Sequence, residues 1–179
     1  MYSARDSHNN SGASQNSDWT SQNDQDLNKF LTFKLMSDKF GIEIIRVKEL
    51  LEYHSATRVP LTPKEIHGVI NLRGSVVPVI NLATRIGKTS GGISKKTCII
   101  IVELAHNNTP VEIGFLVDEV DQVINISNEK IEPTPQFGTD IDPEYIWGMG
   151  NTEDTFIILL DLENVLSVDE LSKLIRQFT

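Results

Sequence analysis

Residues 68–82 read Gly-Val-Ile-Asn-Leu-Arg-Gly-Ser-Val-Val-Pro-Val-Ile-Asn-Leu and form the most informative segment of the chain. Two apolar runs, Val69–Arg73 and Val76–Leu82, flank the dipeptide Gly74-Ser75. A two-residue connection suits a tight β-hairpin, because glycine readily adopts the positive φ angles that such turns require. Pro78 cannot donate a backbone hydrogen bond, so the second run is expected to be an edge strand or to contain a bulge.

Further short strands are predicted on both sides of this hairpin. Segments 31–35 and 40–44 alternate apolar with polar residues, which predicts two half-buried strands joined as a second hairpin. Near-continuous apolar runs, typical of strands buried on both faces, occupy residues 97–104, 111–117 and 156–162. Weaker strand candidates lie at 122–126 and 145–149.

Two capping signatures predict the helices. Thr62–Glu65, with proline at the first helical position, is expected to open about one turn that ends near Gly68. Ser167–Glu170 is expected to open a C-terminal helix over residues 168–177, with apolar residues at helical spacing. This apolar stripe either docks a partner or packs on the protein's own barrel, and we favour packing.

Many short strands separated by frequent turn signals favour an all-β barrel or sandwich over alternating α/β units. Two small barrels fit best, with the segment 87–96, rich in Gly, Ser, Thr and Lys, as their junction. Residues 1–28 are dominated by Ser, Asn, Gln and Asp and contain few large apolar side chains. Such a segment buries too little apolar surface to offset the entropy lost on ordering, so a disordered tail is predicted.

Composition excludes several classes of function. The net charge of −9 disfavours nucleic acid as a partner. The longest apolar runs contain five residues, far short of a membrane span, and residues 1–28 lack the apolar stretch of a secretory signal. The single cysteine, Cys98, lies in an apolar run and cannot form an intrachain disulfide, so a cytoplasmic protein is expected.

No catalytic or metal-binding motif stands out. The sequence has no phosphate-binding loop and no nucleophile elbow, and its four histidines are scattered. Asp140, Asp142 and Glu144 match the first three ligands of a calcium loop, but Tyr145 and Asn151 occupy positions where that loop needs Gly and Glu. We therefore expect no enzyme activity, no cofactor and no metal.

The segment 68–82 strongly resembles the signature G-x-x-N-L-R-G-x-x-x-P-x-x-x-L of the CheW-type chemotaxis coupling family. The likeness extends in family order through residues 40–44, 47–50, 58–60, 114–120 and 157–162, and covers roughly residues 29–174. The resemblance implies two five-stranded SH3-like barrels that enclose a shared apolar core. Barrel 1 would span about 37–90, and barrel 2 about 29–36 plus 95–165. Because the first strand would then complete the second barrel, a cut at Gly91 is expected to unfold both.

The resemblance also implies a non-enzymatic scaffold in the cytoplasm, at membrane-associated receptor arrays. Such a scaffold couples chemoreceptor tips to the regulatory domain of a chemotaxis histidine kinase and transmits receptor state to kinase activity. One alternative is a coupling protein of a surface-motility pathway. Another is a small-ligand-binding β-barrel module, which would need a polar cluster in a pocket that the sequence does not reveal.

Receptor-contact positions implied by the family are Val47, Glu49, Gly68, Arg73 and Gly74. Gly68 and Gly74 would let the backbone of a receptor helix approach closely. Arg73 and Glu49 would bond across a groove or to the receptor. The alternative is that they merely pair with each other at the surface, where such pairs contribute under ~1 kcal/mol.

A kinase contact is predicted at Leu50 and Leu51. These residues would form an exposed apolar pair if Ile42 and Ile44 face the core, and apolar residues are typical of an interface centre. Simple core packing of both leucines is an equally open alternative.

Overall fold

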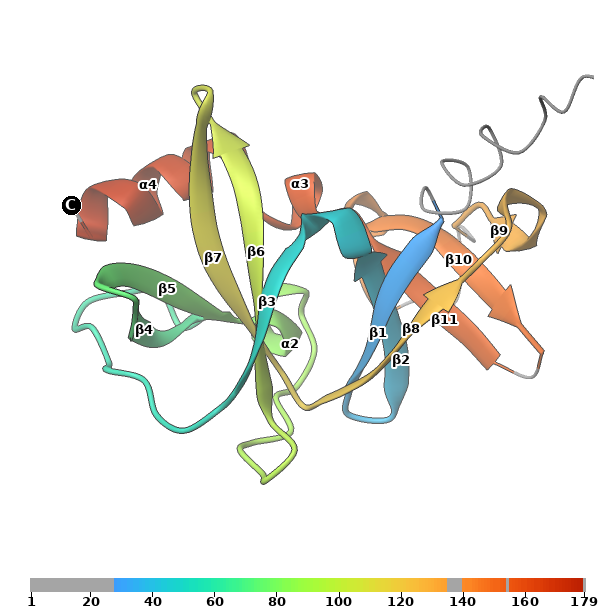
Figure 1. The fold of residues 1–179 in the computed structure, drawn as a ribbon, viewed down its shortest axis with the longest axis horizontal. Coiled ribbons are helices and arrows are strands. Elements are labelled where there is room, and N and C mark those ends of the chain that lie inside the picture. Colours follow the sequence, from blue (N-terminus) through green and yellow to red (C-terminus); the bar gives the residue numbers. More distant parts are fainter. Residues whose placement is uncertain (1–27, 135–139, 154, 179) are drawn as a thin grey trace, which may run out of the picture.

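The computed structural model describes residues 28–134, 140–153 and 155–178. The tail predicted for residues 1–28 therefore lies, apart from Asn28, outside the described residues. The described chain is mostly β-structure, arranged as two sheets that lie side by side (Figure 1). The predicted all-β class is confirmed, and the two sheets correspond to two SH3-like subdomains.

The first sheet has six strands in the order β8-β1-β2-β11-β10-β9. These strands are β1 (Lys29–Leu35), β2 (Asp38–Glu43), β8 (Glu119–Asn125), β9 (Ile131–Glu132), β10 (Ile146–Thr152) and β11 (Thr155–Leu160). Neighbours are antiparallel except β2 and β11, which pair in parallel. This sheet and its loops are called the first subdomain.

The second sheet has five strands in the order β3-β6-β7-β5-β4. These strands are β3 (Val47–Glu52), β4 (Ile66–Leu72), β5 (Ser75–Asn81), β6 (Cys98–His106) and β7 (Thr109–Val117). Only β5 and β7 pair in parallel. This sheet and its loops are called the second subdomain.

The division of strands between the two predicted barrels is wrong. The sequence grouped residues 37–90 in one barrel, whereas β2 joins β1 in the first sheet. Likewise β6 and β7 join β3, β4 and β5 in the second sheet, although the junction at 87–96 was expected to separate them. The chain instead crosses between the sheets at the 3₁₀ turn η1 (Ile44–Arg46) and returns between β7 and β8. Apolar residues at every second position identify a strand but do not determine which strand it pairs with. The backbone hydrogen bonds that pair strands can form between any two sequences.

The hairpin of residues 68–82 forms as β4 and β5, but its turn lies one residue earlier than predicted. Leu72 pairs with Ser75, so Arg73 and Gly74 are the central residues, with φ angles of 50° and 86°. Two positive φ angles are the geometry that matches the twist of a hairpin. Of the two alternatives predicted for this strand, the edge position is wrong, because β5 lies between β4 and β7. The register of the β4–β5 ladder does shift, but the extra residue lies in β4, between Ile66 and Gly68. Pairing with β7 begins at Val79, so Pro78 lies just outside it.

Apolar side chains of the described residues form three cores. The largest core lies between the two sheets and includes Phe33 and Phe40 from the first and Ile100 and Phe115 from the second. A smaller core lies within each subdomain. Strand β1 is buried on both faces, because Thr32 is also buried and its hydroxyl donates to the Gln122 carbonyl oxygen at 2.8 Å. The half-buried strand predicted there is therefore wrong.

The helices are short and sit at strand ends. Within the described ranges they are α2 (Leu82–Arg85), α3 (Leu162–Val165) and α4 (Val168–Phe178), with 3₁₀ turns η2 (Asn128–Lys130) and η3 (Pro143–Tyr145). Helix α4 confirms the predicted C-terminal helix, and its capping box forms: Ser167 N–H donates to Glu170, and Glu170 N–H donates to the Ser167 hydroxyl. Leu174 is buried in the core between the sheets, as the packing alternative expected. The helical turn predicted from Thr62 is only a turn.

Candidate docking surface

The β4–β5 turn holds Arg73 in a defined place. The side-chain oxygen of Asn71 accepts a hydrogen bond from the Gly74 N–H at 2.9 Å. This bond spans the turn and fixes Arg73 in a left-handed conformation that non-glycine residues rarely adopt. The conformation of the turn thus points the Arg73 guanidinium out of the hairpin.

That guanidinium binds Glu49 on β3. Arg73 Nη2 lies 2.8 Å from each carboxylate oxygen of Glu49. The Arg73 side chain is 70% exposed and that of Glu49 is 27% exposed, so one face of the guanidinium remains open to a partner. An exposed pair of this kind contributes about 0–1 kcal/mol to folding, too little to explain the geometry by stability alone.

The pair lies where the second sheet closes on itself. Strands β3 and β4 are its two edges, and Glu49 belongs to β3 while Arg73 follows β4. Farther along, Thr57 and Val69 exchange backbone hydrogen bonds of 2.9 and 2.8 Å, which join the segment after β3 to β4. The Glu49–Arg73 pair and this bridge together connect the two sheet edges.

The two predicted glycines play different physical roles. A Cβ atom on Gly68 would lie 2.6 Å from the Thr57 carbonyl oxygen, so the missing side chain makes room for the protein's own segment. The reason given for Gly68 from sequence, open space for a receptor helix, is wrong. Gly74 has no atom within 4 Å of its Cβ position, and its φ of +86° supplies the turn. The backbone of Gly74 is therefore open to a partner.

Val47 begins β3 and packs, half-buried, against the core between the sheets. The register of β3 against β6 shifts between Val47 and Glu49, at Lys48. The Lys48 ammonium binds the carboxylates of both Glu103 and Glu112, and the hydrogen bonds, first to Glu112 and then to Glu103, raise its pKa. Val47 thus supports β3 from the core side, while Glu49 points to the open surface with Arg73.

The structure separates the two predicted kinase-contact leucines. Leu51 packs, half-buried, against the small core of the second subdomain. Leu50 is 46% exposed and pairs with Ile100 across the β3–β6 ladder. Only Leu50 presents an apolar surface to solvent, and Leu51 follows the core-packing alternative.

Three residues near this surface were not singled out from the sequence. Asn71 fixes the turn, and the Asn side chain three residues before Gly74 was the available signal. Tyr53 and His67 form a pair in which the phenol oxygen lies 2.8 Å from His67 Nε2 and the rings meet edge to face. Burial, followed by the charge of Arg58, lowers the pKa of His67. This pair ties the end of β3 to β4, because its members lie just beyond β3 and within β4.

Of the acidic residues that match the start of a calcium loop in the sequence, Asp142 has a structural role. Asp142 caps η3 by accepting a hydrogen bond from the Glu144 N–H at 3.0 Å. Within the described ranges, no three His, Cys, Asp or Glu side chains gather as metal ligands would.

Burial raises the pKa of the Cys98 thiol. Among the described residues, no helix has the length and apolar character needed to cross a membrane.

Comparison with known proteins identifies relatives over most of the chain. The model of the family described as "CheW-like domain" matches residues 29–170. Chemotaxis protein CheW of Klebsiella aerogenes is 33% identical over 144 residues, which cover 80% of this chain and 84% of that protein. Chemotaxis protein CheW of Bacillus subtilis is 34% identical over 141 residues, covering 77% and 86%.

A solved structure has the same fold. The scaffolding protein TtCheW from Thermoanaerobacter tengcongensis superposes with a TM-score of 0.70 at 38% identity, covering 80% of this chain and 94% of that one. The region that the family model matches, residues 29–170, contains both sheets, the turn at Arg73 and Glu49. The chain belongs to the CheW-like family.

Proposed function

We propose that this protein joins chemoreceptor tips to the regulatory domain of a chemotaxis histidine kinase, with the surface around Arg73 and Glu49 as its receptor contact. The chain is a coupling scaffold of chemotaxis and not an enzyme, as its CheW relatives indicate. A scaffold transmits a signal by holding two partners in a fixed relative geometry, so that a shift in one partner changes the other. Its function therefore depends on two separate docking faces.

The observation that carries the receptor contact is the open face of the Arg73 guanidinium. Glu49 occupies only one of its terminal nitrogens, and the side chain is 70% exposed. The remaining donors form a planar fork that suits a carboxylate or a carbonyl oxygen on a partner. Gly74, next in the chain, lets a partner backbone approach without meeting a side chain. Val47 and Gly68 contribute to the receptor contact indirectly, because they hold β3 and β4 in place.

The receptor contact is tested by reversing the charge of Arg73. Arg73→Glu is expected to abolish co-sedimentation with a receptor fragment while the protein remains folded and still binds the kinase. Lys130→Glu is the matched control, because Lys130 is an exposed cation on η2 in the first subdomain. Unchanged receptor binding by Arg73→Glu would reject the site.

A charge swap separates docking from simple pairing. The double variant Arg73→Glu, Glu49→Arg restores an ion pair between the same two positions. If the pair serves only the fold, the swap restores receptor binding. If Arg73 contacts the receptor, binding stays lost although the thermal midpoint recovers, and we expect this second result.

For the kinase we propose a contact centred on Leu50, with Leu51 supporting it from the core of the second subdomain. An exposed apolar side chain on a well-packed strand is typical of the centre of a protein interface. Leu50→Lys is expected to weaken kinase binding and leave receptor binding unchanged. Ile93→Lys, at a similarly exposed apolar residue of the loop before β6, is the matched control. Equal kinase affinity for both variants would place the kinase contact elsewhere.

The proposed place of action is the cytoplasm, at receptor arrays beside the membrane. Individually weak contacts gain avidity in such arrays, because binding of one partner makes the next contact effectively intramolecular. A fluorescent fusion of the full chain is expected to form polar or lateral foci in its own cells, and Arg73→Glu is expected to disperse them. Foci that persist in this variant would contradict array recruitment through the receptor.

A further inference from the structure

The second sheet closes along a seam, where its two edge strands β3 and β4 meet. In the described part of the chain, β3 and β4 share no ladder of backbone hydrogen bonds. The contacts that cross the seam include the Glu49–Arg73 ion pair, the Tyr53–His67 pair and the backbone bonds between Thr57 and Val69. Side-chain pairs thus take the place of a ladder, so a change in the ionisation of one member can change how firmly the seam is held.

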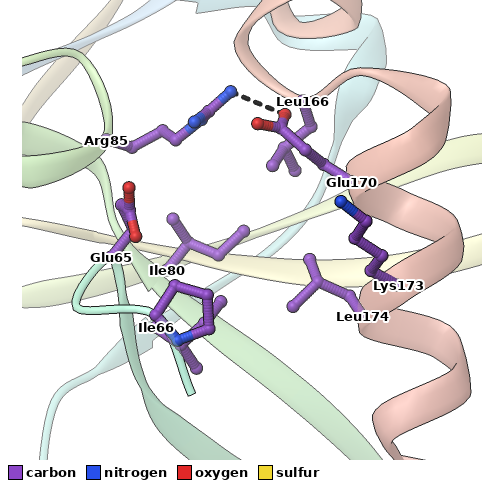
Figure 2. Close-up of a pocket in the computed structure, with 9 residues that line it drawn as sticks. Glu65, Ile66, Ile80, Arg85, Leu166, Glu170, Lys173 and Leu174 are labelled. Carbon is purple, nitrogen blue, oxygen red and sulfur yellow. Dashed lines mark hydrogen bonds and ion pairs between the residues drawn. The ribbon is translucent and has the colours of Figure 1, made fainter. Parts of the chain in front are cut away.

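Strand β4 is held by contacts outside the seam. It pairs with β5 along its whole length. Ile66, which precedes His67, also lines a pocket of about 220 Å³ beneath α4, together with Ile80 and Leu174 (Figure 2). These contacts fix the position of His67, so a force at the seam displaces the facing segment rather than β4.

The segment that faces His67 is held less firmly. Residues 54–58 follow β3 and belong to no strand, and Thr57 reaches β4 through an isolated bridge. Arg58, the next residue, acts on His67 through its charge. A proton on His67 would place a second cation beside Arg58 in a half-buried site. Moving residues 54–58 away from β4 relieves this repulsion and lets water reach the imidazolium.

The groups around His67 favour its neutral form while the seam is closed. Burial, followed by the charge of Arg58, lowers its pKa below 6.5, and no carboxylate of the described residues raises it. Across the register shift at His67, β5 offers only the uncharged residues Val79 and Ile80. The Tyr53 hydroxyl can donate to the neutral imidazole or accept from the protonated one, so it favours neither form.

We propose that His67 is a positioning residue for the receptor contact, and that a proton on its imidazole opens the seam and weakens receptor binding through Arg73. This inference rests on the proposed function, because it takes Arg73 and Glu49 as the receptor surface. Glu49 belongs to β3 and Arg73 directly follows β4, so opening the seam draws apart the two partners of this ion pair. The guanidinium then loses the carboxylate that orients it. By linkage, a receptor that binds the closed seam lowers the pKa of His67 further.

The first test uses the free full chain. The His67 imidazole is titrated by NMR from above pH 6.5 to well below it, and the amide signals of Arg73 and Gly74 are followed in the same samples. These amides are expected to shift with the midpoint of His67. Arg58→Gln removes the repelling charge and is expected to raise this midpoint. Amide signals that ignore the His67 titration, or a midpoint unchanged by Arg58→Gln, would overturn the coupling.

The second test measures affinity for a receptor fragment, at pH values where circular dichroism shows each protein folded. The affinity of the wild type is divided by that of His67→Gln at each pH, so that titration of the receptor itself cancels. This ratio is expected to fall about fivefold or more as His67 gains its proton. His54→Gln, at an exposed histidine, is the matched control and is expected to follow the wild type.

The outcomes separate this inference from the proposed function. A ratio that stays constant with pH, while Arg73→Glu still abolishes receptor binding, would overturn the role of His67 and leave the receptor contact in place. Receptor binding that is unaffected by Arg73→Glu would instead remove the receptor contact on which the inference rests. A further fall in the pKa of His67 when the receptor fragment is added would support both.

Discussion

The carbonyl oxygen of Thr57 lies 2.6 Å from the point at which a Cβ atom on Gly68 would stand. Thr57 also exchanges two backbone hydrogen bonds with Val69, the next residue of β4. A side chain on Gly68 must therefore push the bridging segment away from β4, and no flexible side-chain end is available to yield in its place. Gly68 keeps the second sheet closed behind the Arg73 turn.

Gly68→Ala is expected to lower the free energy of unfolding by about 1–3 kcal/mol, because the added methyl group overlaps backbone atoms. Urea denaturation followed by fluorescence measures this change. If Gly68 served a receptor helix instead, the variant would keep wild-type stability and lose receptor binding. That pattern would refute the closure role.

Asn71 is expected to matter through the turn that it caps. Asn71→Ala removes the acceptor for the Gly74 N–H and should lower the free energy of unfolding by about 0.5–1.5 kcal/mol. Because Arg73 then loses its fixed conformation, receptor binding should weaken as well. Asn71→Asp keeps a side-chain oxygen and is the matched control expected to retain both properties. An Ala variant with unchanged stability and binding would show that the turn forms without the cap.

The lowered pKa of His67 predicts that the folded protein loses stability at acidic pH. Burial holds its pKa in the folded protein below the ordinary value of 6.5, so the unfolded chain binds the proton more readily. The contribution of neutral His67 to the free energy of unfolding is fully present above pH 6.5. It is lost as the pH falls through the lower pKa that His67 has in the folded state. His67→Gln should therefore flatten the decline of the unfolding free energy in this range, measured by urea titrations at several pH values. His54→Gln is the matched control, and equal slopes for wild type and His67→Gln would contradict the prediction.

Local patterns predicted most of the strands and the C-terminal helix, whereas the docking residues came from the family resemblance and stay predictions. The alternation around Phe33 and the capping box at Ser167 act over a few neighbours, so the sequence exposes them directly. The placement of β2 in the first sheet and of β6 and β7 in the second was missed, because strand partners depend on contacts between distant residues. The role of Gly68 was missed for the same reason, since Thr57 approaches it from outside β4.

A backbone cut at Gly91 is expected to leave neither subdomain folded alone. Fragment 1–91 holds β1 to β5, and fragment 92–179 holds β6 to β11, so each sheet draws strands from both fragments. Each separate fragment should lack cooperative thermal unfolding, and an equimolar mixture should recover it. Circular dichroism of the fragments and of their mixture measures this. A cooperative transition in either isolated fragment would show that one sheet is self-sufficient.

The parallel pairing of β2 with β11 also governs when the protein can fold in the cell. Strand β2 ends at Glu43 and β11 begins at Thr155, so β2 waits for its neighbour until most of the polypeptide has left the ribosome. During translation the edge of β2 stays unpaired, and unpaired edges invite aggregation. The edge of β2 is therefore open to pairing with other chains until synthesis has passed β11.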